Sequence, residues 1–273
     1  MTTSNKSTYA RGGLALVYIL SIIIAVLMTI ASIAGLISRA AIYPTEELVQ
    51  SFVPNDVVNL FVGLPILLGS MWLTWRGKLI GPLFWMGALF FVFYNYIGYT
   101  FAAPLTWAFL LFLSLAVMSA YTFISLITSI DGENVSQRLT GAVPERLAGG
   151  VLIGLGLLFM LRVLGVLLGA IFNDAGLPRT EIAVNIADFF IAPAWIIGGI
   201  QLWRRQTFGY VTGLGLLFQG SMLFIALVVF LLLQPLLTSA PFAIVDVIVV
   251  LVMGLICFIP FGLFVRGVVA NDE

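Results

Sequence analysis

Long apolar stretches separated by short polar ones dominate the pattern of this chain. A bilayer core of about 30 Å is crossed by about 20 helical residues, and eight stretches reach that length. They cover about residues 14–37, 57–75, 79–101, 105–127, 147–172, 185–203, 208–233 and 242–265. Backbone groups in lipid must pair within their own segment, and the dyad alternation of membrane strands is missing here. The pattern therefore predicts an all-α, polytopic bundle of eight transmembrane helices in a lipid bilayer.

The basic residues are unevenly divided between the two sets of connecting loops. If the N-terminus is placed inside, the inner loops hold nine of them: Lys6, Arg11, Arg76, Lys78, Arg138, Arg146, Arg204, Arg205 and Arg266. The outer loops hold Arg39 and Arg179. Short cytoplasmic loops carry the excess of Lys and Arg. We therefore expect both termini on the cytoplasmic side of a multi-pass protein of the cell (plasma) membrane.

The longest predicted inner loop divides the chain into two parts with four spans each. Residues 1–128 form the first half, residues 129–146 a polar cytoplasmic linker, and residues 147–273 the second half. The linker contains Asp131-Gly132-Glu133-Asn134 and is too short to form a domain of its own.

The two halves also share a sequence pattern at a constant spacing of 128 residues. Seven positions match their counterparts: Pro65, Trp75, Arg76, Gly81, Gly87, Leu89 and Phe90 with Pro193, Trp203, Arg204, Gly209, Gly215, Leu217 and Phe218. Apolar residues match by chance, but the spacing of Pro, Trp-Arg and Gly is more specific. Since each half has an even number of spans, we expect a parallel 4+4 repeat about an axis along the membrane normal.

The outer segment before the second span has the composition of a short interfacial helix. Thr45 is a suitable N-cap, and Glu46 and Glu47 would lie favourably in a first turn. We therefore expect a separate helix here, ahead of a span that begins near residue 57.

A single arginine, Arg162, lies deep within the fifth apolar stretch. An arginine at the centre of a membrane helix costs about 2.5–3.5 kcal/mol, so it normally faces the bundle interior and a partner. Asp188 and Asp246 are the candidate partners, each about one turn inside the outer end of its span. The pair would serve either a substrate or ion site or, equally well, helix packing.

A second polar group occupies the outer ends of the second and third spans. Asn95 and Tyr99 are spaced to share a helix face, and Tyr96 lies beside Tyr99. Tyr99 also fits an interfacial tyrosine. Asp56 and Asn59 begin the second span, where they would line an outer vestibule or, as the better interpretation for Asp56, cap the helix.

Composition excludes several kinds of chemistry. The chain is 62% hydrophobic and only 9% charged, with zero net charge, so we expect no nucleic-acid partner. It has no histidine, one cysteine (Cys257) and no carboxylate cluster, which argues against metal sites, haem and cofactors. A serine nucleophile would lack its usual base. We therefore expect no enzyme activity.

Three functions remain compatible with these features. The first is a small transporter- or channel-like protein with a pocket between the halves, near the Arg162 cluster. The second is a non-transporting membrane subunit, or an assembly partner of a larger complex, binding a membrane protein or a second copy of itself. The third is a protein that binds lipid or quinone through its aromatic residues.

Overall fold

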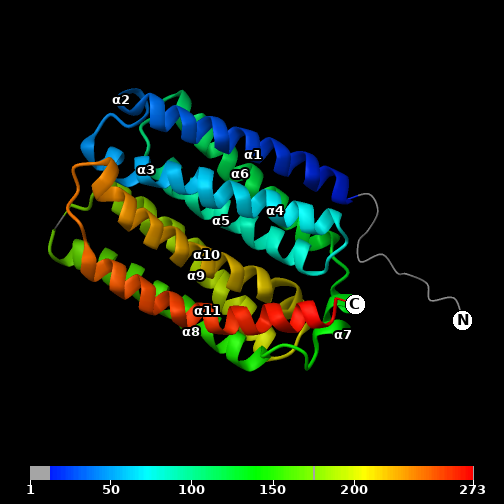
Figure 1. The fold of residues 1–273 in the computed structure, drawn as a ribbon. Coiled ribbons are helices and arrows are strands. Elements are labelled where there is room, and N and C mark those ends of the chain that lie inside the picture. The colour runs from blue at the N-terminus through cyan, green and yellow to red at the C-terminus, as the bar shows by residue number, and fades with distance from the viewer. Residues whose placement is uncertain (1–12, 175, 273) are drawn as a thin grey trace, which may run out of the picture.

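The computed structural model describes residues 13–174 and 176–272, so Lys6 and Arg11 of the expected inner set lie outside the described residues. Over those ranges the chain forms helices and no strands, which confirms the all-α prediction. Eight helical stretches are long and apolar enough to cross a membrane, as the sequence pattern predicts. The chain is therefore a multi-pass membrane protein whose long helices run roughly side by side (Figure 1).

The helices follow one another with short connections. The part of the chain up to residue 129 forms α1 (Gly13–Ile37), α2 (Arg39–Ile42), α3 (Glu46–Val58), the π-helical turn η1 (Asn59–Gly63), α4 (Leu64–Trp75), α5 (Ile80–Ala102) and α6 (Trp107–Ser129). The remainder forms α7 (Gly132–Leu139), α8 (Glu145–Phe172), α9 (Arg179–Trp203), α10 (Thr207–Leu237) and α11 (Ile244–Ala270). In Figure 1 the first group occupies the upper part of the bundle and the second group the lower part.

The second span differs from the sequence prediction. Thr45 does cap α3, its hydroxyl accepting from the backbone N–H of Leu48, but no separate interfacial helix forms. Instead α3, η1 and α4 run continuously from Glu46 to Trp75. Pro65 has no N–H to donate, and the turn before it widens so that Leu64 N–H reaches the carbonyl of Asn59. A π turn of this kind adds one residue to the helix and is frequent at functional sites.

The polar linker also holds more structure than expected. Asp131 accepts from the backbone N–H of Asn134 and caps the short helix α7. Val135 and Leu139 are buried where α7 packs against α10. Apolar residues at i and i+4 of a polar segment thus tie the linker to the bundle.

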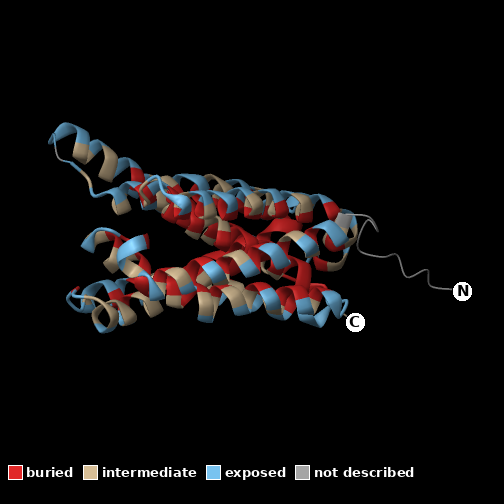
Figure 2. Cartoon of the chain, turned by 90° about the horizontal axis from the view of Figure 1, so that it is seen from above, coloured by how far each residue is buried: buried red, intermediate tan, exposed pale blue. Residues whose placement is uncertain are grey.

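The centre of the bundle is formed by α5 and α10, the most buried of the spans. They cross where Gly87 meets Gly215: a Cβ at position 87 would overlap the carbonyl oxygen of Gly215, and one at position 215 would lie 2.8 Å from the carbonyl oxygen of Leu83. Small residues allow helices to approach this closely in membranes. Buried residues line the middle of the bundle and exposed ones its outer faces (Figure 2).

The turns that follow α4 and α9 have the same hydrogen bonds. Gly77 N–H donates to Thr74 and Lys78 N–H to Leu73; 128 residues later, Arg205 N–H donates to Leu202 and Gln206 N–H to Gln201. The pattern is that of a Schellman motif. The C′ residue has positive φ in both turns, 74° at Gly77 and 57° at Arg205.

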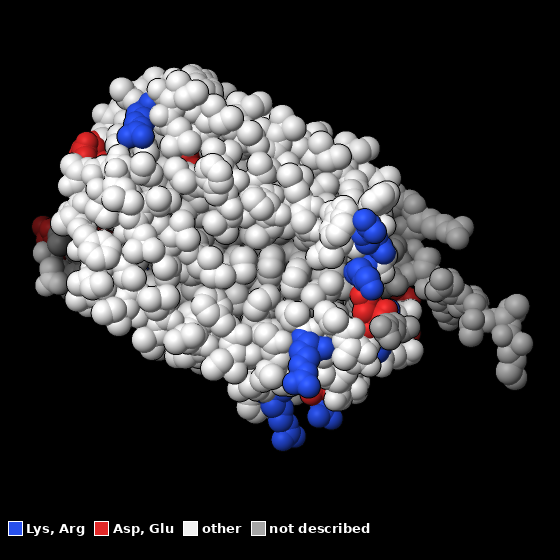
Figure 3. All heavy atoms as spheres, in the orientation of Figure 1, with Lys and Arg blue, Asp and Glu red and all other residues white. Residues whose placement is uncertain are grey.

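On the face shown in Figure 3, charged residues gather at the two ends of the bundle and leave a broad uncharged band between them. We call the end with Gly13 and Ala270 the proximal end and the opposite one the distal end. At the proximal end Lys78 pairs with Asp272 at 3.8 Å and Arg205 with Glu145 at 3.7 Å. Such an uncharged band is what a lipid-facing surface requires.

Candidate functional site

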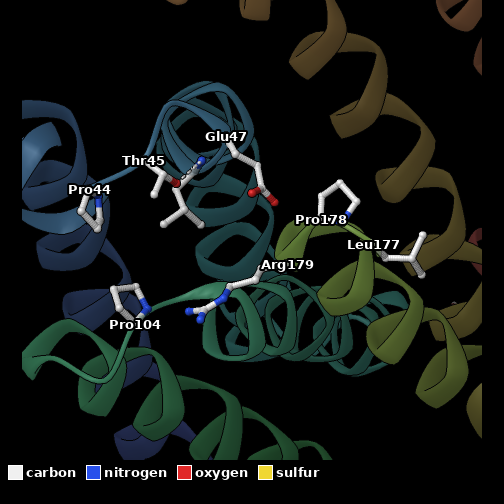
Figure 4. Close-up of a pocket in the computed structure, with 8 residues that line it drawn as sticks. Pro44, Thr45, Glu47, Pro104, Leu177, Pro178 and Arg179 are labelled. Carbon is white, nitrogen blue, oxygen red and sulfur yellow. Dashed lines mark hydrogen bonds between the residues drawn. The ribbon is translucent and has the colours of Figure 1, made fainter. Parts of the chain in front are cut away.

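A pocket of about 500 Å³ opens at the distal end, between the two halves. Figure 4 shows its walls: Pro44 and Thr45 precede α3, Pro104 follows α5, and Leu177, Pro178 and Arg179 lead into α9. Glu47 and Leu48 complete the lining from α3. Across the pocket, Glu47 Oε1 accepts from the backbone N–H of Thr180 at 2.8 Å and from its hydroxyl at 2.6 Å. This contact joins the halves at the distal end.

Beyond the pocket along α3, aromatic rings pack beside a buried acid. Leu48, Phe52 and Asp56 follow each other at four-residue intervals on one face of α3, a distance of about 12 Å from the first to the last. The Phe52 ring stacks on Tyr99 with centroids 4.2 Å apart and lies 5.6 Å from that of Tyr43. Phe52 thus lies one turn beyond the pocket residue Leu48 on α3, and the rings of Tyr43, Phe52 and Tyr99 form an aromatic layer beside Asp56.

Asp56 is 1% exposed and is the centre of a hydrogen-bond network. Its Oδ2 accepts from the Tyr43 hydroxyl at 2.8 Å, and its Oδ1 accepts from the Tyr99 hydroxyl at 2.9 Å. The network continues through Asn59, whose amide donates to Tyr99 Oη at 3.3 Å, to Asn95, whose amide donates to Asn59 at 3.4 Å. Among the described residues no Lys or Arg forms an ion pair with Asp56.

Two hydroxyl groups at this network have no hydrogen-bond partner within the part of the chain that the structure describes. Ser32 Oγ and Tyr96 Oη are both fully buried and unpaired there. Ser32 adjoins both Asp56 and Tyr96, and the absence of a side chain at Gly35, one turn further along α1, leaves space for the Asp56 carboxyl. A buried polar group without a partner costs about 1–3 kcal/mol and requires an explanation.

Tyr43 lies outside the spans, and burial together with the adjacent Asp56 raises the pKa of its hydroxyl well above the ordinary value. Tyr43 therefore remains a hydrogen-bond donor to Asp56 at any physiological pH.

The second acid of the site is Asp188 on α9, which is also 1% exposed. Arg162 Nη1 on α8 donates to its Oδ2 at 2.8 Å, and Tyr94 on α5 donates to its Oδ1 at 3.0 Å. Tyr94 and Asn95 are neighbours in sequence, so α5 contacts the Asp188 group and the Asp56 network from adjacent positions. Close packing of α8 on α9, at Gly149, Gly156 and Gly199, brings Arg162 within reach.

The arginine is only partly enclosed. The Arg162 side chain is 44% exposed on the outward face of α8, whereas that of Asp188 is 2% exposed. Asp246 is also exposed, in the first turn of α11, and does not contact Arg162. The sequence left both acids open as partners, and the structure selects Asp188.

The structure joins most of the candidate residues and changes the role of two. Asp56, Asn59, Asn95 and Tyr99 form one network, and the Tyr96 and Tyr99 rings lie 5.2 Å apart. The interpretation of Asp56 as a helix cap is wrong, because α3 begins ten residues earlier. Tyr99 is 1% exposed, so it is not an interfacial residue.

Sequence reasoning did not single out Ser32 or Tyr43 as members of the network. The available signal for Ser32 was its place as one of two serines in the first span, three residues before Gly35. Within the described residues no three Cys, Asp or Glu side chains lie close enough to hold a metal ion.

Comparison with family models, with curated proteins and with solved structures finds no match to this chain.

Proposed function

We propose that this protein is a small membrane transporter whose pathway starts at the distal pocket and passes between its two halves. The observation that carries the proposal is the stacking of three features along α3: a pocket, an aromatic layer and the fully buried Asp56. Buried acids in spans are costly and mark substrate or ion pathways. Asp188 lies nine residues beyond the pocket residue Arg179, so both acids lie at a similar depth below the pocket.

The proposed transporter is built from two copies of one four-helix unit, related by a parallel two-fold axis. The repeated turn after α4 and α9 supports this duplication. So does the meeting of Gly87 with Gly215, since a two-fold axis runs where a residue contacts its own counterpart.

The π turn supports a further correspondence between the proposed copies. Because η1 adds one residue before Pro65, the spacing upstream of it becomes 129 instead of 128. Asp56 then corresponds to Asn185, and Asn59 corresponds to Asp188. Each half thus has one acid and one amide at these two positions, in opposite order. Each half would thus supply one buried acid to the pathway, at two matched positions.

The distal end faces the outside in this proposal, with both termini in the cytoplasm of a cell whose plasma membrane holds the protein. The excess of Lys and Arg at the proximal loops supports this orientation.

The test is the access of water to the network between the acids. In a Cys257→Ala background, Asn95→Cys should react with a charged, membrane-impermeant thiol reagent added to the distal side of the protein in vesicles. Ile97→Cys, two residues along α5 and 4% exposed, is the matched control and should not react. Equal absence of reaction at both positions would contradict a pathway.

A second function is favoured by one observation, the partial exposure of Arg162. A guanidinium half exposed at the middle of a span is costly, and a partner subunit packed on α8 would remove that cost. A membrane subunit of a larger complex should be recovered with a stoichiometric partner when the native protein is purified in mild detergent. Recovery of the chain alone would contradict this second function.

A further inference from the structure

We propose that Asp56 is a reversible proton-binding site, in which Ser32 accepts the hydrogen bond of the protonated acid and Tyr43 and Tyr99 donate to the deprotonated one. This inference rests on the proposed function in one respect: as part of a transporter, the proton bound here would be the coupling ion. The site itself is inferred from geometry that stands independently of transport.

The first observation is that no ion pair within the described part of the chain holds Asp56 in its charged form. The carboxyl is 1% exposed and lies within a span. Arg39 acts on it through its charge, but the Arg39 guanidinium donates to the carbonyls of Leu36 and Leu237 and forms no ion pair with Asp56. The protonation state of a buried carboxyl without an ion-pair partner depends on its hydrogen bonds and on its surroundings.

The other groups around Asp56 are uncharged. Tyr43 reaches it from the segment before α3, Tyr96 and Tyr99 lie on α5, and Ser32 lies on α1. The side chains of α9 and α10 that form hydrogen bonds with α3 are Thr180, with Glu47, and Gln234, with the Gln50 carbonyl, and both bonds lie toward the distal end. Protonation of Asp56 would thus change the charge of the site as a whole.

The hydrogen bonds differ between the two protonation states. In the charged form each carboxylate oxygen accepts from one tyrosine, Tyr43 at 2.8 Å and Tyr99 at 2.9 Å. The neutral acid gains an O–H donor and needs an acceptor for it. Ser32 Oγ adjoins the carboxyl, is fully buried and has no partner among the described residues. It is therefore available to accept that proton's hydrogen bond, which accounts for a polar atom that is otherwise unsatisfied.

Close packing favours a proton over a metal cation at this position. Gly35 is needed for the carboxyl to fit, since a Cβ there would overlap Asp56 Oδ2 and lie 2.6 Å from the Tyr43 hydroxyl. A hydrated or coordinated cation needs several oxygen ligands around an open volume, whereas a proton bound to the carboxyl needs no open volume.

Infrared difference spectroscopy of the full chain in lipid vesicles tests the site. The spectrum of the wild type should contain a carbonyl band of a protonated carboxylic acid that disappears as the pH rises. The band should be absent from Asp56→Asn, which retains one acceptor oxygen for a tyrosine and gains an N–H donor, and should remain in Asp188→Asn. A band that does not titrate, or that survives in Asp56→Asn, would overturn the proposal.

Two further variants test the roles of the hydroxyl groups. Tyr99→Phe removes a donor to the charged form, so the midpoint should move to higher pH by about one unit. The Ser32 hydroxyl can accept from the neutral acid and can also donate to the carboxylate, so Ser32→Ala should shift the midpoint less than Tyr99→Phe does. A shift to lower pH in Tyr99→Phe, or a larger shift in Ser32→Ala than in Tyr99→Phe, would contradict the assigned roles. If Asp56 titrates as expected while Asn95→Cys stays closed to water, the proton site stands and only the transporter function fails.

Discussion

Tyr94 and Asn95, adjacent residues of α5, contact two different buried acid groups: Tyr94 donates to Asp188 at 3.0 Å, and Asn95 donates at 3.4 Å to Asn59 of the Asp56 network. One central helix therefore links an acid from each half. A change at either acid can therefore affect the other through these hydrogen bonds and one turn of α5.

The ion pair between Arg162 and Asp188 gives the first prediction. Arg162→Leu leaves Asp188 buried without a cation and should lower the free energy of unfolding by about 3 kcal/mol. Asp188→Asn alone leaves the guanidinium unpaired in the span and should also destabilise. The two changes together should be close to neutral, because the amide introduced at position 188 would still accept from Tyr94. Thermal unfolding in lipid nanodiscs measures all three.

Asp246→Asn is the control for this series and should have little effect, because Asp246 is exposed and lies apart from Arg162. Additive losses from the two single changes would contradict the pairing, since residues in direct contact are not additive.

The crossing of α5 and α10 gives the second prediction. Gly87→Ala would force a methyl group against the Gly215 carbonyl, and we expect a loss of about 2 kcal/mol in the free energy of unfolding. Gly98→Ala on the same helix meets no atom within 4 Å and is the matched control, expected to be neutral or slightly stabilising. Equal stability of the two variants would show that the helices do not cross at Gly87.

The repeated turn gives the third prediction. Arg205 has a φ of 57°, a conformation that costs an L-residue about 1 kcal/mol and costs glycine almost nothing. Arg205→Gly should therefore stabilise the protein by about 1 kcal/mol, and Gly77→Arg should destabilise it by a similar amount. Glu145 is buried but keeps its hydrogen bonds from Gly141 N–H and the Tyr210 hydroxyl, so the loss of its 3.7 Å pair with the exposed Arg205 should cost little. Thermal unfolding measures the stability of both variants. A change of stability in the same direction in both variants would contradict the interpretation.

Much of the fold follows from sequence because lipid imposes simple rules on a chain. Length and hydropathy are sufficient to identify eight spans, and an arginine within a span such as Arg162 must find an acceptor. Which acceptor it finds depends on helix packing. Asp246 and Asp188 look alike in sequence, and only the close approach of Gly149 to Gly199 places α9, not α11, against Arg162.

The sequence wrongly predicts Asp56 as a helix cap for a related reason. Apolar character begins near residue 57, so sequence suggests a helix start there. The helix in fact begins at Glu46 because Thr45 caps it, and α3 packs against α1 and α10 although its first turns are partly polar. Hydropathy reports exposure to lipid, and it does not detect polar residues that a bundle encloses.

Membrane orientation gives the fourth prediction. In the Cys257→Ala background, Glu46→Cys at the distal end should be labelled by an impermeant reagent applied to intact cells. Thr140→Cys at the proximal end should be labelled only after the membrane is opened. The basic residues of the proximal loops are the reason for this expectation. Labelling of Thr140→Cys on intact cells would show that the orientation is the opposite one and that the pocket opens toward the cytoplasm.

The movement of the two halves is tested most directly by a distance measured across the distal pocket. Spin labels at Pro44→Cys and Leu177→Cys, on opposite walls in Figure 4, report that distance by pulsed electron resonance in lipid vesicles. We expect two distance populations, one with the pocket open and one with it closed, in proportions that change with pH in the wild type and stay fixed in Asp56→Asn. A single distance that is the same at every pH and in both proteins would contradict a transporter controlled by the buried acid.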